Sequence, residues 1–425
     1  MNDTREGFRR LHVEDWRQFE SVDLEIHPRL TVLTGANASG KSTLLALLAR
    51  HFNWARGYSS SPVRVKRGNA WHTLGRRRAR RVLQQPGLWD TVGTLGYANG
   101  AETVISVPAV TDPNNRTQYD ITLNSQQAVQ GLFISSHRLA SGNYTHVPTI
   151  PTSFMPPDQL FEQFANEARQ RWAGGWSGRP PQMAMKEALI SAAVFGTRGN
   201  DSVDFNQDAF DIWHGFQRIA QTLMPKSLGF EALRVRAPDV ILQTSSDDFV
   251  IDEASGGISA ILEIAWQLFL KSRVNPAMTV VMDEPENHLH PSLQRDLMPN
   301  LLQAFPLAQF VVATHSPFVV TAVEDSNVYV LDYNNERRVE SRKLDYINKA
   351  ASADETLRRV LGLDSTYPSW AIEEFDEIVS KYLAGSVSTE RMRALRAELN
   401  NAGLVGQFPE AVERISDSVA EDSFE

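Results

Sequence analysis

The sequence contains no cysteine, which excludes disulfide bonds and thiolate metal sites and leaves the redox compartment open. Hydrophobic runs are short, and none approaches the roughly 20 consecutive apolar residues of a membrane-spanning helix, so we expect no membrane partner. The opening residues, MNDTREGFRRLH, lack the apolar core of a secretory signal, which predicts a cytoplasmic protein. Acidic residues outnumber basic ones, which gives a net charge of −9. Any contact with a nucleic acid therefore needs a local basic patch.

Internal repeats, low-complexity segments and long heptad runs are missing too, which argues against a long coiled-coil arm. The 425 residues are 42% apolar and 22% charged, a composition typical of soluble globular proteins. This length is sufficient for two or three domains or for one elaborated domain.

The sequence does contain a phosphate-binding loop between a strand and a helix. Residues 30–33 form an apolar, strand-like run, and a helix-like apolar pattern restarts at Lys41. The loop between them fits the pattern G-x-x-x-x-G-K-S through Gly35, Gly40, Lys41 and Ser42. In such a loop the backbone N–H groups and the helix dipole face phosphate oxygens, while the lysine reaches the β- and γ-phosphates and the serine ligates Mg²⁺. A chance glycine turn is the alternative, but Lys41 and Ser42 are in register for the motif.

Two stretches predict antiparallel strands. Apolar and polar residues alternate along residues 8–29, as they do in an edge hairpin, and this stretch leads directly into the phosphate-loop strand. Residues 91–134 indicate a meander with a two-residue turn at Asn99-Gly100, followed by a second strand pair within residues 118–135.

An arginine-rich segment separates these stretches, and it includes Arg76, Arg77 and Arg78. Clustered arginine can neutralise the phosphates of DNA or RNA, and it can equally dock on an acidic surface of a partner protein. The third interpretation is a solvated loop that pairs with the protein's own acidic surface.

The rest of the chain alternates helices with strands. Residues 156–228 indicate a helical insertion, after which strands return. Ser255-Gly256-Gly257 then opens a strongly apolar helix, and on pattern alone Ser255 can be an ordinary N-cap. The region 336–425 is polar and predicts three helices. The expected divisions are an N-terminal half of the domain with the phosphate loop (1–155), a helical insertion (156–228), a C-terminal half of the same domain (229–335) and a helical region (336–425).

Two buried strands end in chemically active side chains. The apolar run TVVM is followed by Asp283 and Glu284, which can hold the water shell of Mg²⁺ and orient an attacking water. The run QFVVAT delivers His315 to the same sheet edge, where open α/β sheets bind ligands. The alternatives are a surface turn for the carboxylates and a structural role for the histidine.

Taken in order, the phosphate loop, the Ser-Gly-Gly helix, the strand-Asp-Glu and the strand-His resemble the motifs of ABC-type ATPases. Trp16-Arg17-Gln18-Phe19 is similar to the N-F-R-like element of the SMC and DNA-repair branch. DEPENHLHP and ATHSPF resemble the overcoming-lysogenisation-defect (OLD) ATPases, and GLFISSHR with residues 144–151 resembles the ATPase subunits of the Septu and PARIS anti-phage systems. The resemblance covers most of the chain. It implies an α/β ABC-ATPase (P-loop) domain with a mixed central sheet, an antiparallel β-subdomain, a helical insertion and C-terminal helices.

The resemblance also implies a role for each matching residue. Asp283 is the Walker B acid, which holds Mg²⁺ together with Ser42; Glu284 is the catalytic base; and His315 is the switch histidine. Ser255, Gly256 and Gly257 form the signature that closes on the ATP of a partner subunit, with Asn287 and His288 near the dimer seam. The residues implied to bind ATP are Arg17, Gly35, Ala36, Asn37, Ala38, Ser39, Gly40, Lys41, Ser42 and Thr43.

Some positions depart from the family pattern. Ala38 replaces the glycine usual in SMC phosphate loops, and Ala254 and Ile258 flank the signature where transporters have leucine and glutamine. The Q-loop glutamine has no certain match, and its candidates are Gln84, Gln85 and the residues near Ser136.

The implied function is that of an ATP-hydrolysing subunit (ATP + H₂O to ADP + phosphate) of an anti-phage defence complex. It would sense infection and control a nuclease or toxin. We expect that effector to be a separate chain, because only about a hundred residues follow His315 and none shows a Toprim-like Glu…DxD pattern. The expected assembly is a homodimer or a higher assembly of dimers. The alternatives are an SMC-like ATPase of DNA repair or chromosome maintenance and, disfavoured by the N-terminus and signature, a transporter ATPase.

Overall fold

The chain forms two compact units in the computed structural model, Met1–Thr356 and Leu357–Glu425. The described residues are 7–55, 57–59, 63–64, 71–72, 89–108, 118–137, 147–148, 153–175, 180–199, 203–345, 352–363, 365, 367–383 and 388–422. Arg76, Arg77 and Arg78 lie outside these ranges, as do Gln84 and Gln85, so the contacts expected of them stay predictions.

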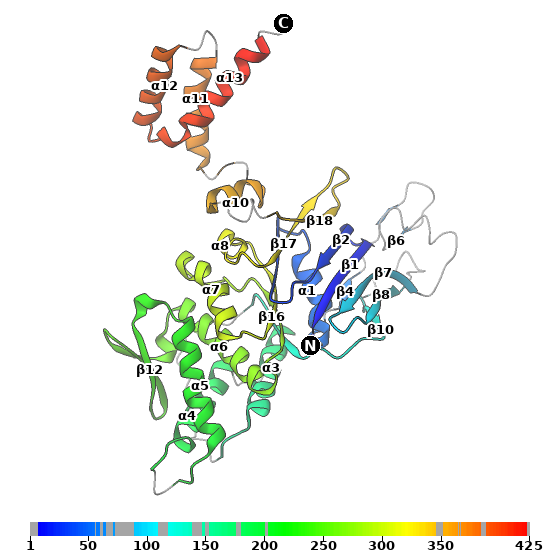
Figure 1. The fold of residues 1–425 in the computed structure, drawn as a ribbon, viewed down its shortest axis with the longest axis vertical. Coiled ribbons are helices and arrows are strands. Elements are labelled where there is room, and N and C mark those ends of the chain that lie inside the picture. The colour runs from blue at the N-terminus through cyan, green and yellow to red at the C-terminus, as the bar shows by residue number, and fades with distance from the viewer. Residues whose placement is uncertain are drawn as a thin grey trace. The chain divides into compact units, whose positions relative to one another are not determined.

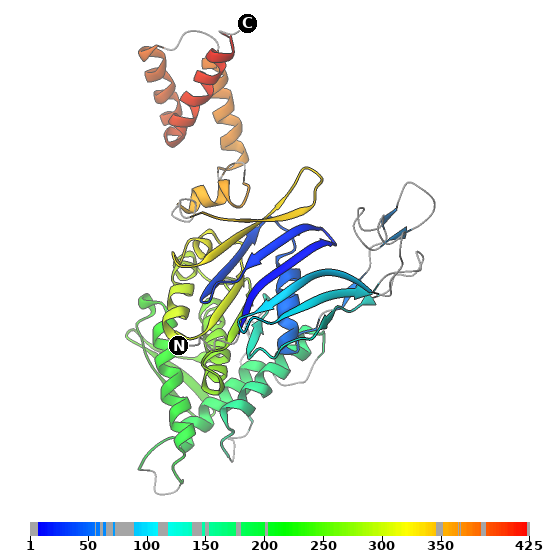
Figure 2. The same cartoon turned by 45° about the vertical axis from the view of Figure 1, so that its right-hand side comes forward.

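The first unit is built on an 11-stranded mixed sheet, which confirms the expected α/β class. The strand order is β10-β8-β7-β1-β2-β18-β17-β3-β16-β15-β11, and Figure 2 shows the sheet passing from the cyan β7 and β8 through the blue β1 and β2 to β18. The strands are β1 (Phe8–Trp16), β2 (Phe19–Glu25), β3 (Leu30–Gly35), β7 (Trp89–Tyr97), β8 (Glu102–Pro108), β10 (Thr122–Asn124), β11 (Gly131–Ile134), β15 (Thr279–Asp283), β16 (Gln309–Ala313), β17 (Asn327–Tyr333) and β18 (Val339–Lys343). Separate small sheets pair β4 (Tyr58–Ser59) with β9 (Gln118–Tyr119), and β5 (Val63–Arg64) with β6 (Trp71–His72).

The site-bearing part of the sheet is parallel and fully buried. β3, β16, β15 and β11 pair in parallel, and every residue of β3, β15 and β16 is buried. Continuous apolar runs such as TVVM form strands of this kind because both faces of the sheet are covered. The carboxyl ends of these strands therefore meet at one edge, where the chain places its polar loops.

The N-terminal hairpin has the expected partners but not the expected position. β1 and β2 pair antiparallel, with Trp16 opposite Phe19. The prediction of an edge hairpin is wrong, because β1 also pairs with β7 and β2 also pairs with β18. Alternation of buried and exposed residues shows that one face of a strand meets solvent, but it does not show whether the strand's edges are paired.

The meander is predicted in part. β7 and β8 pair antiparallel around the expected Asn99-Gly100 turn, where Gly100 adopts φ 85°. The second expected pair is wrong, because β10 pairs with β8 while β11 pairs in parallel with β15. The buried partner of β11 lies 148 positions away in the sequence, with Gly131 opposite Thr279 and Ile134 opposite Met282, and no local pattern reveals such a pairing.

Helices cover the sheet and extend from it at one end of the unit (Figure 1). They are α1 (Lys41–Ala49), α3 (Pro157–Trp172), α4 (Pro181–Phe195), α5 (Gln207–Leu223), α6 (Gly256–Val274), α7 (Pro291–Ala304) and α8 (Pro317–Val320), with short 3₁₀ turns η1 (Arg50–Phe52), η2 (Lys226–Leu228) and η3 (Ile251–Glu253). A further helix, α10 (Ala353–Arg359), contains the boundary between the two units. The range expected as a helical insertion holds α3, α4 and α5, and α3 and α5 contact α6. A three-stranded sheet follows the insertion, formed by β12 (Phe230–Arg236), β13 (Asp239–Thr244) and β14 (Asp248–Val250).

The second unit is helical and has its own core. Its helices are α11 (Ser369–Leu383), α12 (Thr389–Asn401) and α13 (Phe408–Asp422), with a 3₁₀ turn η4 (Val405–Gln407). Phe375, Leu395 and Ile415 are buried against one another in this core. The unit begins after Thr356 rather than at residue 336, because residues 339–343 form β18 and pair with β17 and β2 in the large sheet.

A partly buried histidine, His51, lies in the 3₁₀ turn that follows the phosphate-loop helix. Nδ1 of His51 lies 3.1 Å from the Leu48 carbonyl oxygen and Nε2 lies 3.0 Å from the Tyr97 hydroxyl. The imidazole also packs edge-on against Phe8, with ring centroids 4.9 Å apart. Burial lowers the pKa of His51 from 6.5 to about 4, because a charged imidazole would lose its hydration there.

This shift predicts acid sensitivity of the first unit. Below pH 6.5 the unfolded chain protonates His51 while the folded chain does not, so the stabilisation present above pH 6.5 is lost as the pH falls towards 4. The free energy of unfolding, measured by denaturant titration at pH 7 and pH 4, should fall by up to about 3 kcal/mol more in wild type than in His51→Gln. His290→Gln, at an exposed position, should behave like wild type. Equal losses in wild type and His51→Gln would contradict this assignment.

Candidate active site

The phosphate loop joins β3 to α1, and two of its glycines are required by close contacts. Gly35 has φ 135°, and a Cβ there would lie 2.5 Å from the Leu331 carbonyl oxygen. Gly40 has φ 100°, and a Cβ there would lie 2.4 Å from both the Gln18 side chain and the Phe19 ring. Ala38 also takes a left-handed conformation, with φ 63°, where the family pattern has glycine. The loop therefore keeps its shape at Ala38 at a cost of about 1–2 kcal/mol.

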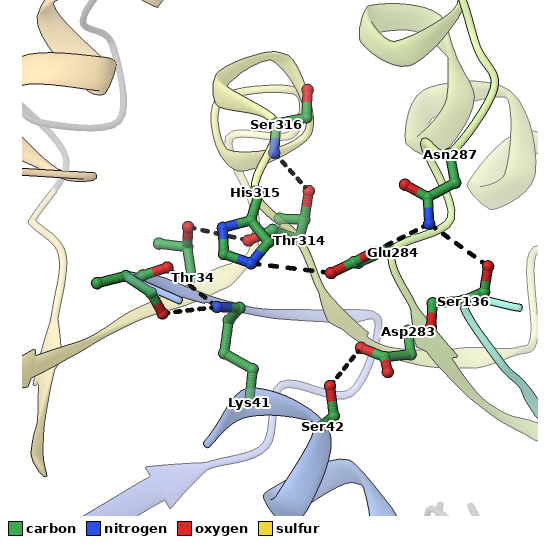
Figure 3. Close-up of polar contacts among 12 residues, drawn as sticks. Thr34, Lys41, Ser42, Ser136, Asp283, Glu284, Asn287, Thr314, His315 and Ser316 are labelled. Carbon is green, nitrogen blue, oxygen red and sulfur yellow. Dashed lines mark hydrogen bonds and ion pairs between the residues drawn. The ribbon is translucent and has the colours of Figure 1, made fainter. Parts of the chain in front are cut away.

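Lys41 is buried and points across the loop that precedes it. Its Nζ donates to the carbonyl oxygens of Gly35 and Ala36, at 3.0 and 3.1 Å (Figure 3). Burial lowers the pKa of Lys41, and the nearby carboxylates of Glu284 and Asp283 oppose that shift. An ammonium group in this position can bind a phosphate oxygen by exchanging two carbonyl partners for an anionic one.

The loop offers further groups that fit a phosphate. The Ser39 hydroxyl is buried and has no hydrogen-bond partner among the described residues. The first N–H groups of α1, including those of Lys41 and Ser42, lack carbonyl partners one turn earlier in the helix. An oxyanion at this position would accept hydrogen bonds from donors that are otherwise unsatisfied, and this is the chemistry of a nucleotide's phosphate chain.

Ser42 and Asp283 form the pair that could hold a metal ion. The Ser42 hydroxyl donates to Oδ1 of Asp283 at 3.2 Å, which joins the first turn of α1 to the end of β15 (Figure 3). Burial raises the pKa of Asp283, and the hydrogen bond from Ser42 opposes the shift. The described residues contain no cluster of three or more His, Cys, Asp or Glu side chains suited to a metal. One hydroxyl and one carboxylate fit Mg²⁺, which usually takes its remaining ligands from phosphate and water.

Glu284 and His315 face each other just beyond the carboxyl ends of the neighbouring strands β15 and β16. Oε1 of Glu284 lies 3.8 Å from Nε2 of His315, and both side chains are about one-third exposed (Figure 3). Asn287 Nδ2 donates to the other carboxylate oxygen of Glu284 at 2.9 Å. The Glu284 backbone has φ 47°, and its N–H donates to the Ala313 carbonyl oxygen at 2.8 Å, which turns the side chain out of the strand. Burial lowers the pKa of His315, with Lys41 acting in the same direction and Glu284 opposing.

Glu286, which the sequence did not single out, lies between these two turns. Its Oε1 accepts hydrogen bonds from Thr314 Oγ1 at 2.6 Å and from the backbone N–H groups of His315 and Ser316 at 2.9 and 3.2 Å. Burial raises its pKa. Its position two residues after Glu284 was the signal available, but that spacing does not distinguish a buried carboxylate from a solvated turn residue.

The proposed signature lies beside the turn that follows β15. Ser255 is exposed and caps α6, with the Ile258 N–H 3.5 Å from its hydroxyl oxygen. A Cβ on Gly257 would lie 2.9 Å from the His288 carbonyl oxygen. Among the described residues, no hydrogen bond joins Ser255, Gly256 or Gly257 to the phosphate loop of the same chain. The role of the signature in a partner subunit's site stays a prediction.

Arg17 and Ser136 lie in two different connections near the site, the β1–β2 turn and the segment that follows β11. Arg17 sits in the β1–β2 turn next to Gln18, and its guanidinium carbon lies 5.5 Å from the centroid of the Tyr58 ring. The Ser136 carbonyl oxygen accepts from Asn287 Nδ2 at 3.4 Å, which brings the carboxyl end of β11 to the Glu284 turn. Of the Q-loop candidates, those near Ser136 therefore lie at the site, while Gln84 and Gln85 are outside the described residues.

Each described site residue thus lies at or next to one edge of the sheet. Asn37 and Thr43 complete the phosphate loop and the first turn of α1. The helices that the structure describes include none that is long and apolar enough to cross a membrane.

Parts of this chain are similar in sequence to known proteins. The retron Ec83 probable ATPase of Escherichia coli is 36% identical over 114 residues, which cover 24% of this chain and 21% of that protein. The Septu protein PtuA of Bacillus thuringiensis is 24% identical over 170 residues, covering 36% of this chain and 43% of that protein. The chain thus spans less than half the length of these curated relatives. They confirm the expected resemblance to ATPases of the Septu type.

Among solved structures, the SMC head domain from Thermotoga maritima covers 80% of this chain and 99% of its own, with a TM-score of 0.40 and 14% identity. The SmcHead bound to the C-winged helix domain of ScpA has a TM-score of 0.45 and 13% identity, over 80% of this chain and 97% of its own. The profile of the family described as "AAA domain, putative AbiEii toxin, Type IV TA system" matches residues 30–321, more than half of the chain. The chain therefore belongs to this family of ATPases.

Proposed function

We propose that this chain binds ATP with Mg²⁺, hydrolyses ATP, and works as the ATPase subunit of an anti-phage defence complex that controls a separate nuclease or toxin. The observation that supports it most is the meeting of Lys41, the Ser42–Asp283 pair and the Glu284–His315 pair at one sheet edge. These are the groups that a phosphoryl transfer to water needs: a phosphate cation, a metal site and a base for the water. The named relatives, a retron ATPase and Septu PtuA, support the defence context.

In this proposal each side chain has one task. Lys41 and the N–H groups of the loop bind the β- and γ-phosphates, and Ser39 donates its free hydroxyl to them. Ser42 and Asp283 hold Mg²⁺, which when bound neutralises phosphate charge. Glu284 accepts the proton of the attacking water, oriented by Asn287, and neutral His315 donates a hydrogen bond to the γ-phosphate.

The remaining assignments of the proposal follow the chain. Residues 1–155 and 229–335 would make the two halves of the ATPase domain, with β18 added to the second half, and residues 156–228 would be an insertion. Arg17 would contact the nucleotide from the β1–β2 turn, beside Gly40. Arg76, Arg77 and Arg78 would meet a nucleic acid or an acidic partner.

Phage plating tests the defence role. Cells that express this chain with its neighbouring genes should resist phage, and Lys41→Ala should abolish that resistance. The exposed variant Lys343→Ala should keep it, since Lys343 pairs with Glu25 on the face of the sheet. Resistance that survives Lys41→Ala would exclude ATP from the defence role, while ATP turnover measured on the purified chain tests the enzyme separately.

Assembly gives a further prediction, because an exposed Ser255 can reach only a second subunit's ATP in this proposal. ATP should shift Glu284→Gln from monomer to dimer or to a higher assembly of dimers, as measured by light scattering. Adding Ser255→Arg should prevent the shift, since the bulky cation would stand where the two subunits close. Ser21→Arg, at an exposed position on β2, is the matched control and should leave assembly unchanged. A Ser255→Arg protein that assembles and turns over ATP normally would contradict the composite site.

A further inference from the structure

Three consecutive residues of the turn that carries His315 donate hydrogen bonds to one buried carboxylate oxygen. Oε1 of Glu286 accepts three hydrogen bonds from consecutive residues, Thr314, His315 and Ser316. One donor is the backbone N–H of His315 itself, and another is the Thr314 hydroxyl, which also accepts from the Ser316 N–H at 2.9 Å. The conformation of the whole turn therefore depends on where this oxygen lies.

A second tie joins the same two segments. The Ser316 hydroxyl donates to Gln294 Oε1 at 2.6 Å, and Gln294 Nε2 donates to the Leu289 carbonyl oxygen at 2.9 Å. Leu289 N–H in turn donates to the carbonyl oxygen of Glu286 at 2.9 Å. The His315 turn is thus attached at two points to the segment that begins with the Glu284 carboxylate.

The other oxygen of Glu286 indicates that the arrangement serves more than packing. Glu286 is only 7% exposed, and its Oε2 has no hydrogen-bond partner among the described residues. Burying an unsatisfied carboxylate oxygen is costly, and a hydrophobic residue or a threonine at this position would avoid that cost. The raised pKa of Glu286, caused mainly by burial, reflects the same cost.

We infer that Glu286 is a positioning residue for His315: its Oε1 fixes the 314–316 turn and thereby sets the imidazole against the Glu284 carboxylate. The inference rests on the proposed hydrolysis of ATP, in which both groups act on the γ-phosphate and the attacking water. In this proposal Glu286 itself contacts neither the γ-phosphate nor the attacking water. Any effect of Glu286 on ATP turnover must therefore act through His315, unlike the effect of a residue that only stabilises the fold.

A double-mutant cycle in ATP turnover tests the inference. Glu286→Ala should lower kcat by about 10- to 100-fold, as loss of an orienting partner does, with KM little changed because the phosphate loop is intact. Glu286→Gln keeps an acceptor oxygen and should recover kcat to within about fivefold of wild type, since a neutral acceptor makes weaker bonds. In a His315→Ala background, Glu286→Ala should cause no further loss. Glu336→Ala, exposed in the turn between β17 and β18, is the matched control.

Independent losses that multiply in the double mutant would overturn the inference, as would a Glu286→Gln protein as impaired as Glu286→Ala. If Glu286→Ala fails to fold, Thr314→Val removes one donor to Oε1 and should show the same dependence on His315. The ring proton resonance of His315, assigned from its absence in His315→Ala, should shift in Glu286→Ala and stay near its place in Glu286→Gln. A wild-type protein that does not hydrolyse ATP would overturn the proposed function, whereas an unmoved His315 resonance would overturn the positioning role alone.

Discussion

Replacing Lys41 with alanine should abolish ATP binding at working concentrations. The ammonium group lies within the loop at 3.0 and 3.1 Å from two carbonyl oxygens, so it needs only a local movement to reach a phosphate. A hydrogen bond to a charged group contributes about 1.5–3 kcal/mol, and a lysine between two phosphates can make more than one, so the Kd for ATP should rise about 100-fold or more. Calorimetric titration with ATP and Mg²⁺ measures this directly.

Two controls separate loss of binding from loss of structure. Lys343→Ala removes an exposed lysine from the same unit and should leave the Kd unchanged. Thermal unfolding of Lys41→Ala without nucleotide should remain cooperative, because the loop loses two hydrogen bonds but no apolar core contact. Tight ATP binding by a folded Lys41→Ala protein would exclude this loop as the nucleotide site.

Glu284→Gln should separate ATP binding from ATP hydrolysis. The amide keeps the shape of the side chain and can still meet Asn287, but it cannot accept a proton from water. Loss of a general base lowers kcat by about 10²- to 10⁴-fold, while the Kd for ATP should stay close to wild type because the phosphate contacts are unchanged. Phosphate release under saturating ATP measures kcat, and calorimetric titration measures the Kd.

The outcome of that experiment also assigns the role of the carboxylate. Glu102→Gln, at an exposed position on β8, should hydrolyse ATP like wild type. Equal turnover in wild type and Glu284→Gln would exclude Glu284 as the base and leave His315 as the candidate for that role. A Glu284→Gln protein that no longer binds ATP would instead show that the side chain supports the loop.

The sequence allowed prediction of the groups that stand where a strand ends. Asp283 follows an apolar run of four residues, and His315 follows another, and parallel strands bring such ends together. The role of Glu286 could not be predicted in this way. The turn after β16, about 30 residues later in the chain, supplies the three groups that donate hydrogen bonds to Glu286, and local sequence does not show that this turn packs there.

The limits for the fold have the same physical cause. The alternation of apolar and polar residues along β1 and β2 predicted that these strands pair with each other. It could not predict that β7 and β18 are their other neighbours, because both come from distant segments of the chain. β18 is short and mostly exposed, and its sequence VESRK has few of the residues that favour strands. It forms a strand because its backbone pairs with β17 and β2. Contacts between distant segments decide these features, and local patterns do not report them.

The position of β3 has a consequence for the synthesis of the protein. This strand carries the phosphate loop, yet both its neighbours, β16 and β17, begin only at residues 309 and 327. At a synthesis rate of about 5–20 residues per second, roughly 15–60 s pass before β16 has been made. During that time the apolar run of β3 has neither of its neighbouring strands beside it, and the proposed ATP site is not yet assembled. Chaperones that shield hydrophobic segments on the ribosome should therefore engage the first 300 or so residues for most of their synthesis.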